Sequence, residues 1–101
     1  MESLKNLELS KFPEVDEIDK EIIKDHFKRF FTKVNVVDDD LLHISVKDYS
    51  KGGLRTQHEV KAKLILGGKV FVASETNWQL IETIQDVLKK LEKEVLKSTS
   101  K

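Results

Sequence analysis

The sequence contains no cysteine and only one each of proline, tryptophan, tyrosine and methionine. The absence of cysteine excludes disulfide bonds, thiolate metal sites and cysteine nucleophiles. No apolar run approaches the roughly 20 residues that a membrane helix requires. The first ten residues carry acids and lack the basic and then apolar layout of a signal peptide. We therefore expect a cytoplasmic protein that does not interact with membranes.

Sequence motifs of catalytic and cofactor sites are missing as well. There is no Gly-x-Ser-x-Gly, no His-Glu-x-x-His and no zinc-ligand pattern. Gly52–Gly53 and Gly67–Gly68 lack the lysine and the helix of a phosphate-binding loop, and they are typical of turns. Asp38–Asp40 and His43 offer metal ligands, but a calcium loop also needs a bend glycine and a distal glutamate, so we favour a solvated turn. We expect no enzyme, no metal or cofactor, and no small-molecule substrate.

The composition is that of one globular domain with a strongly solvated surface. Of the 101 residues, 39% are apolar and 36% are charged. We expect a single domain over residues 1–101, with a flexible polar tail at 98–101. Net charge is zero, but residues 1–40 hold 11 acids and 7 bases (−4), whereas residues 41–101 hold 7 acids and 11 bases (+4). A basic side of this kind can attract polyanions, although two solvated helices of different composition would explain it too.

The first third of the chain predicts a short strand followed by a helix. Leu4, Leu7 and Leu9 indicate the strand, which ends before Pro13. Asp16 is a candidate N-cap for a helix that runs to about Lys33. The predicted apolar positions of that helix recur at spacings of three to five and are Ile18, Ile22, Phe27, Phe30, Phe31 and Val34.

The middle of the chain alternates in the manner of strands. Residues 42–46 and 56–66 have period two, with residues 48–53 between them as a loop. Gly67–Gly68 predicts a hairpin turn that pairs Leu64 with Phe71 and Ala62 with Ala73. This register predicts a buried sheet face of Val60, Ala62, Leu64, Phe71 and Ala73, and an opposite face of Lys61, Lys63, Ile65, Val70 and Val72.

The last third predicts an amphipathic helix. Thr76-x-x-Gln79 is a possible capping box at its start. Its apolar positions are Leu80, Ile81, Ile84, Val87, Leu88, Leu91 and Val95. The element order is thus β-α-β-β-β-α. It predicts an α+β fold, a two-layer sandwich with two helices packed on one face of a mostly antiparallel four-stranded sheet.

This order resembles the ribosome hibernation-promoting factor family, also called ribosome-associated inhibitor A proteins. The resemblance is best over residues 58–97, HEVKAKLILGGKVFVASETNWQLIETIQDVLKKLEKEVLK. The family's last helix starts with Asp-Met-Tyr-x-Ala-Ile-Asp and has a Lys-Leu-x-Arg-Gln middle; the matching residues here are Asn77, Trp78, Ile84, Lys90, Leu91 and Lys93. Asn77 and Trp78 replace the family's Asp and Met, and the first helix is unusually acidic. The resemblance implies binding to the ribosome and rRNA, near the decoding region of the small subunit, and inhibition of translation during stress or dormancy.

Basic residues are the candidate RNA-binding groups. Lys90, Lys93 and Lys97 recur at three and four and therefore lie on one helix stripe, with Lys89 beside it. Lys47, Lys51 and Arg55 surround the predicted loop, and the planar guanidinium of Arg55 suits a phosphate. The alternative interpretation is an ordinary solvated helix face with ion pairs to Glu82, Glu92 and Glu94.

A protein–protein module, or a homodimer through the exposed sheet face, is the main alternative to a ribosome-binding protein. Ile65, Val70 and Val72 would form the apolar centre of such an interface. For Trp78 we favour a staple onto the sheet over a stacking platform for a base. For His26 and His58 we favour structural positions.

Overall fold

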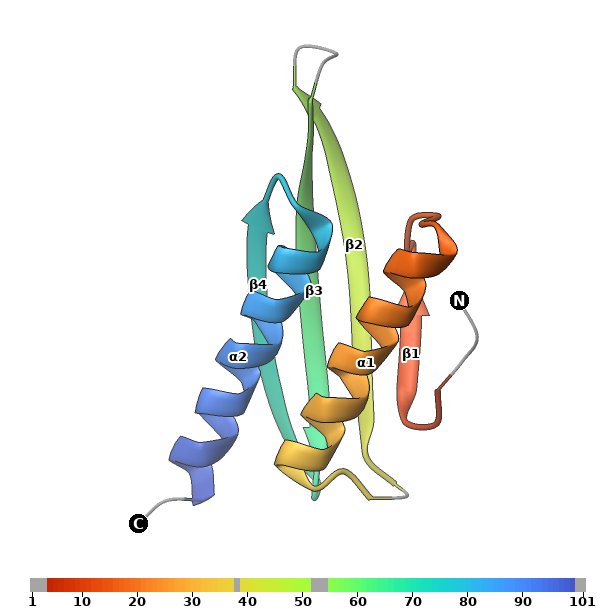
Figure 1. Cartoon of the computed structure of the whole chain (residues 1–101). Coiled ribbons are helices and arrows are strands. Elements are labelled where there is room, and N and C mark those ends of the chain that lie inside the picture. Colours follow the sequence, from red (N-terminus) through yellow and green to blue (C-terminus); the bar gives the residue numbers. More distant parts are fainter. Residues whose placement is uncertain (1–3, 38, 52–54, 100–101) are drawn as a thin grey trace.

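The computed structural model describes residues 4–37, 39–51 and 55–99 (Figure 1). The elements are β1 (Leu7–Ser10), α1 (Glu17–Val34), β2 (Leu41–Lys51), β3 (Arg55–Leu66), β4 (Lys69–Asn77) and α2 (Leu80–Thr99). The strands form one sheet in the order β1-β2-β3-β4, with β1 parallel to β2 and the other pairs antiparallel. Both helices lie on the same face of this sheet (Figure 1). The predicted two-layer α+β sandwich is confirmed.

The glycine hairpin sets the register of the sheet as predicted. Gly67 and Gly68 have φ angles of 58° and 80°, which a two-residue turn of this hand requires. Leu64 pairs with Phe71, and Ala62 pairs with Ala73. The side chains predicted to face the core are buried in β3 and partly buried in β4. Alternation then places the intervening side chains on the face that the helices leave open.

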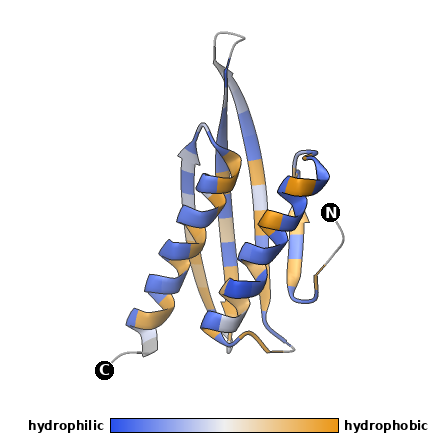
Figure 2. Cartoon of the chain, in the orientation of Figure 1, coloured by the Kyte–Doolittle hydropathy of each residue, from blue (hydrophilic) through white to orange (hydrophobic). Residues whose placement is uncertain are grey.

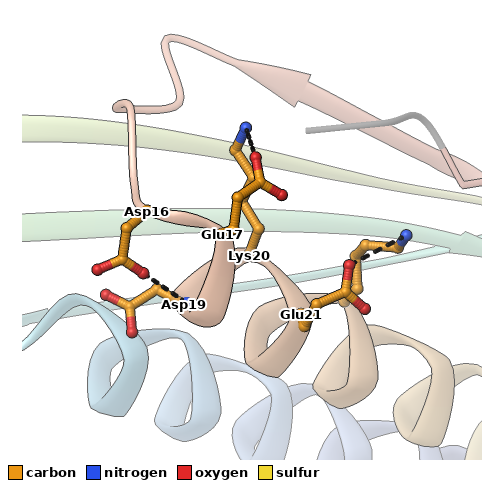
Figure 3. Close-up of polar contacts among 6 residues, drawn as sticks. Asp16, Glu17, Asp19, Lys20 and Glu21 are labelled. Carbon is orange, nitrogen blue, oxygen red and sulfur yellow. Dashed lines mark hydrogen bonds and ion pairs between the residues drawn. The ribbon is translucent and has the colours of Figure 1, made fainter.

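The start of α1 is stabilised by its acidic residues (Figure 3). Asp16 caps the helix, because its Oδ1 accepts a hydrogen bond from the backbone nitrogen of Asp19 at 2.8 Å. Glu17 and Asp19 lie in the first turn, where the helix dipole favours negative charge. The helix ends at Asn35, which adopts a left-handed conformation with φ 57°.

The buried stripe of α1 differs from the prediction in its first half. Ile18 and Ile22 are 74% and 40% exposed, so their assignment to the core was wrong. Ile23 is fully buried instead, and it lies in line with the buried residues Phe27, Phe30 and Val34. The spacing of four, three and four follows one helical face, whereas Ile22 is rotated about 100° away from Ile23. Figure 2 shows apolar and polar positions alternating along both helices.

The predicted loop at residues 48–53 is wrong over its first four residues. Asp48–Lys51 continue β2 and pair with residues of β3, ending at Lys51 opposite Arg55; Gly52 and Gly53 lie outside the described residues. β1 ends opposite Ser45 and β4 ends opposite His58. Beyond those points, residues 49–51 of β2 and 55–57 of β3 pair only with each other among the four strands, and they form a two-stranded arm that projects past the rest of the sheet in Figure 1.

The last helix packs as predicted but starts and ends differently. Ile84, Val87, Leu88, Leu91 and Val95 are buried. The predicted capping box was wrong, because Thr76 lies within β4 opposite Glu59. The carbonyl of Gln79 instead accepts bonds from the backbone nitrogen and the hydroxyl of Thr83, at 3.0 and 2.6 Å. The helix also includes Ser98 and Thr99 of the predicted tail.

Asp40 is buried, contrary to the prediction of a solvated acidic turn. Only 7% of the residue is exposed. Its carboxylate accepts a hydrogen bond from the backbone nitrogen of Val37 at 2.9 Å and another from that of Gly67 at 3.0 Å. Asp40 therefore ties the turn before β2 to the β3–β4 hairpin. Asp39 is exposed, and Asp38 lies outside the described residues.

Candidate functional site

Three of the predicted basic residues lie together between α2 and the edge strand β4. Lys90, Lys93 and Lys97 line a hollow of about 400 Å³ with Val72, Ala73, Ser74 and Glu94. We call this the α2 lysine groove. Its three ammonium groups come from successive turns of one helix, so an extended polyanion could run along them.

Lys90 also has a structural role within this groove. Its Nζ lies 2.7 Å from Glu75 Oε2 and donates to the main-chain oxygen of Ser74 at 3.1 Å. The hydrogen bond from Lys90, helped by the charge of the ammonium group, holds the pKa of Glu75 below its ordinary value of about 4.5. Edge strands offer unpaired backbone groups to other chains, and Lys90 occupies one of them on β4.

The remaining lysines of α2 differ in their surroundings. Lys97 lies 4.0 Å from Glu94, and both side chains are largely exposed, so this ion pair contributes little. Lys89 does not join the α2 lysine groove. It lines a separate hollow between the helices with Arg29 and Lys33, where Lys33 lies 3.9 Å from Glu92.

Two basic residues near the arm pack against aromatic rings. The guanidinium of Arg55 lies 4.1 Å from the centre of the Trp78 ring, and Nζ of Lys47 lies 5.3 Å from that of Tyr49. Cation–π contacts of this kind orient a basic side chain without neutralising its charge. The contact between Arg55 and Trp78 was not predicted, because the two residues are far apart in sequence. The side chain of the third predicted residue, Lys51, is outside the described part of the structure.

The histidines away from the open sheet face agree with structural positions. His26 Nε2 lies 2.8 Å from the side-chain nitrogen of Gln85 and so links α1 to α2. His58 Nδ1 lies 2.7 Å from Asp48 Oδ1 across the β2–β3 pair.

The open face of the sheet carries a second cluster that sequence reasoning only partly identified. A hollow of about 620 Å³ is lined by Ser10, His43, Ser45, Lys61, Ala62, Lys63, Val72, Ala73 and Ser74. The two lysines were placed on this face by the hairpin register. The serines and His43 come into line with them only through the pairing of all four strands, which single-strand patterns do not reveal.

Within residues 4–37, 39–51 and 55–99, no group of three or more His, Cys, Asp or Glu side chains is arranged to hold a metal ion. Among the helices described, none is long and apolar enough to cross a membrane.

Comparison with solved structures gives the fold a clear counterpart. A ribosomal subunit interface protein from Coxiella burnetii matches with a TM-score of 0.66 and 17% identity, over 94% of this chain and 98% of that one. The chain has the fold of a ribosomal subunit interface protein. The N-terminal domain of Protein Y from Thermus thermophilus also matches, with a TM-score of 0.58 and 16% identity, over 91% and 93% of the two chains.

The structural matches confirm the resemblance noted at residues 58–97 and extend it over nearly the whole domain. By sequence, no protein-family model and no curated protein matches the chain. The resemblance is therefore one of fold, and function has to be argued from the surface.

Proposed function

We propose that this protein binds the small ribosomal subunit through rRNA and inhibits translation under stress or dormancy. The observation that carries the proposal is the end-to-end match to a ribosomal subunit interface protein, with 98% of that chain covered. The lysines gathered in the α2 lysine groove support it, because clustered lysines bind phosphates and release counterions. The proposed role is non-catalytic and places the protein in the cytoplasm with the ribosomes.

Within the groove, the three lysines would contribute unequally. Lys93 and Lys97 are exposed; among the described residues Lys93 has no ion pair, and Lys97 is paired only weakly with Glu94. Lys90 would have to exchange Glu75 for a phosphate, which lowers its net contribution. Lys93 and Lys97 are therefore the main proposed contacts, with Lys90 next.

The arm would provide a second contact. Arg55 and Lys47 keep their charge while they lie over Trp78 and Tyr49. The arm extends beyond both edge strands, so it can reach into a groove that the body of the domain cannot enter. Lys51, at the end of β2 in the arm, is proposed to contact RNA together with Arg55 and Lys47. Lys89 would contact RNA only if the RNA also follows the hollow between the two helices.

Sedimentation with ribosomes at several salt concentrations tests the proposal. The variant Lys90→Gln/Lys93→Gln/Lys97→Gln should bind more weakly, and its salt slope should fall by roughly 2–3 units. The matched control is Lys20→Gln/Lys24→Gln/Lys28→Gln, which removes three charges at four-residue spacing from α1. Lys20 and Lys24 pair there with Glu17 and Glu21, so the control should keep its affinity.

Melting temperatures of both variants show whether folding is preserved. If the α2 variant folds and binds ribosomes like the wild type, the groove is not the RNA site, and Lys47→Gln/Arg55→Gln becomes the deciding variant. If the unaltered protein does not sediment with ribosomes even at low salt, the proposed function is wrong.

Self-association through the open sheet face is the second candidate. Val70 and Val72 favour it, because they are 57% and 67% exposed on a face that the helices leave uncovered. Lys61 and Lys63 on the same face oppose it, since a two-fold interface centred there would bring four ammonium groups together.

A further inference from the structure

The open face of the sheet has a row of hydroxyl groups beside two lysines. The pairing of the four strands aligns Ser10, Ser45, Lys61 and Ser74 in one row, and Glu8, His43, Lys63 and Val72 in the next. Residues aligned in this way lie on the same face, with neighbouring strands about 4.8 Å apart. Ser45 and Ser74 therefore flank Lys61 on the two neighbouring strands, Ser10 lies one strand beyond Ser45, and Lys63 is two residues further along β3.

These polar groups are not used by the fold. Lys61, Lys63 and the hydroxyls of the three serines make no hydrogen bond or ion pair with any other residue that the structure describes. Neither nearby carboxylate pairs with the two lysines: Glu8 lies 3.5 Å from Nδ1 of His43, which itself lines the hollow, and Glu59 accepts a hydrogen bond from the Tyr49 hydroxyl. The two positive charges are thus uncompensated and lie beside a set of unused donors.

The size of the hollow and the environment of His43 agree with a ligand site. Its hollow of about 620 Å³ is within the range of small-molecule sites. His43 Nε2 is shielded from solvent and has no hydrogen-bond partner among the described residues, which is unusual for a buried nitrogen. Val72, 67% exposed, provides an apolar wall beside the charged groups.

We propose that this hollow binds the phosphate group of a small phosphorylated molecule about the size of a nucleoside monophosphate. Lys61 and Lys63 provide the positive charge, and the serine hydroxyls donate hydrogen bonds to the phosphate oxygens. Val72 lies against the apolar part of the ligand. This site is assigned from the open face alone, and it does not depend on the ribosomal function proposed above.

The experiment uses the full chain with three probes: adenosine monophosphate, inorganic phosphate and adenosine. Nuclear magnetic resonance titration should show saturable shifts at residues 43, 45, 61, 63, 72 and 74 with adenosine monophosphate. Inorganic phosphate should shift the same residues more weakly, and adenosine should not. Equal shifts with adenosine and its monophosphate, or no saturable shift with either phosphate compound, would overturn the proposal.

Two double variants make the test specific. Lys61→Gln/Lys63→Gln should weaken adenosine monophosphate binding by about tenfold or more, because it removes two charge-assisted contacts. The control Lys20→Gln/Lys28→Gln removes two charges from α1 and should stay within about twofold of the wild type. Equal losses of affinity in both variants would mean that adenosine monophosphate binds only through general charge attraction, and the proposed site would be wrong.

A short single-stranded RNA is the fourth probe and distinguishes the two sources of phosphate. If RNA shifts the same residues and adenosine monophosphate does not, the face belongs to an RNA surface and the small-ligand proposal is wrong. The triple α2 variant separates the two proposals, since it should lose ribosome binding and keep the adenosine monophosphate shifts.

Discussion

The two faces of the sheet are built from the same strands but meet different requirements. On the face covered by the helices, Leu42, Ile44, Val60 and Leu64 are fully buried. On the open face, the residues alternating with them include lysines, serines and two valines that are more than half exposed. Folding requires the covered face to be apolar, whereas it requires little of the open face. The polar pattern of the open face is therefore better evidence of function than the core is.

The largest difference in stability should appear between alanine substitutions of two adjacent residues that lie on opposite faces of β3. Leu64→Ala should lower the free energy of unfolding by about 2–4 kcal/mol, because it leaves a cavity in a closely packed core. Lys63→Ala, one position away on the open face, should change it by less than about 0.5 kcal/mol. Urea denaturation measures both. Equal losses in the two variants would mean that the covered and open faces are wrongly assigned.

Substitution of Asp40 tests how much the buried carboxylate that joins the turn before β2 to the β3–β4 hairpin contributes to stability. Asp40→Ala leaves the backbone nitrogens of Val37 and Gly67 without their acceptor, and should cost about 1–3 kcal/mol. Asp39→Ala removes an exposed carboxylate one residue earlier and should be nearly neutral. The same denaturation measurement applies. A neutral Asp40→Ala would show that water replaces the carboxylate at both nitrogens.

The sequence predicted the covered face well because its signals are local. The alternation in β3 and the turn at Gly67–Gly68 were enough to set the register of the hairpin. The period of α2 identified its buried positions in the same way. In α1, by contrast, Ile22 and Ile23 are adjacent, and only the contact with the sheet decides which of them is buried.

The site residues were harder to predict because their neighbours are distant in sequence. Spacing alone placed Lys90, Lys93 and Lys97 on one stripe, but the pairing of Lys90 with Glu75 depends on how α2 lies against β4. The contact of Arg55 with Trp78 arises because β3 and β4 pair antiparallel: Asn77, next to Trp78, lies opposite His58, three residues from Arg55.

A smaller effect concerns the edge of the covered face, where Lys90 of α2 bonds to Glu75 of β4. Folding lowers the pKa of Glu75, so the folded state favours the ionised carboxylate. The stability gained is present above the unfolded pKa and is lost as the pH falls through the folded pKa. Lys90→Met should therefore flatten the decline of stability between about pH 5 and pH 3. Thermal melts across this range measure it, with Lys93→Met as the control. An unchanged decline in Lys90→Met would show that the pair does not contribute.

The smallest expected effect is weak self-association through the open face. Val70 and Val72 provide exposed apolar surface, but Lys61 and Lys63 repel their counterparts in a second copy. Light scattering should therefore detect a mass increase only at high protein concentration. Added salt screens the lysines and should strengthen this association, whereas it should weaken ribosome binding. Val70→Thr should weaken the mass increase and leave ribosome binding unchanged, because Val70 does not line the α2 lysine groove. A constant monomer mass into the millimolar range at high salt would show that the open face does not pair with itself, and would leave its lysines and serines to a different ligand.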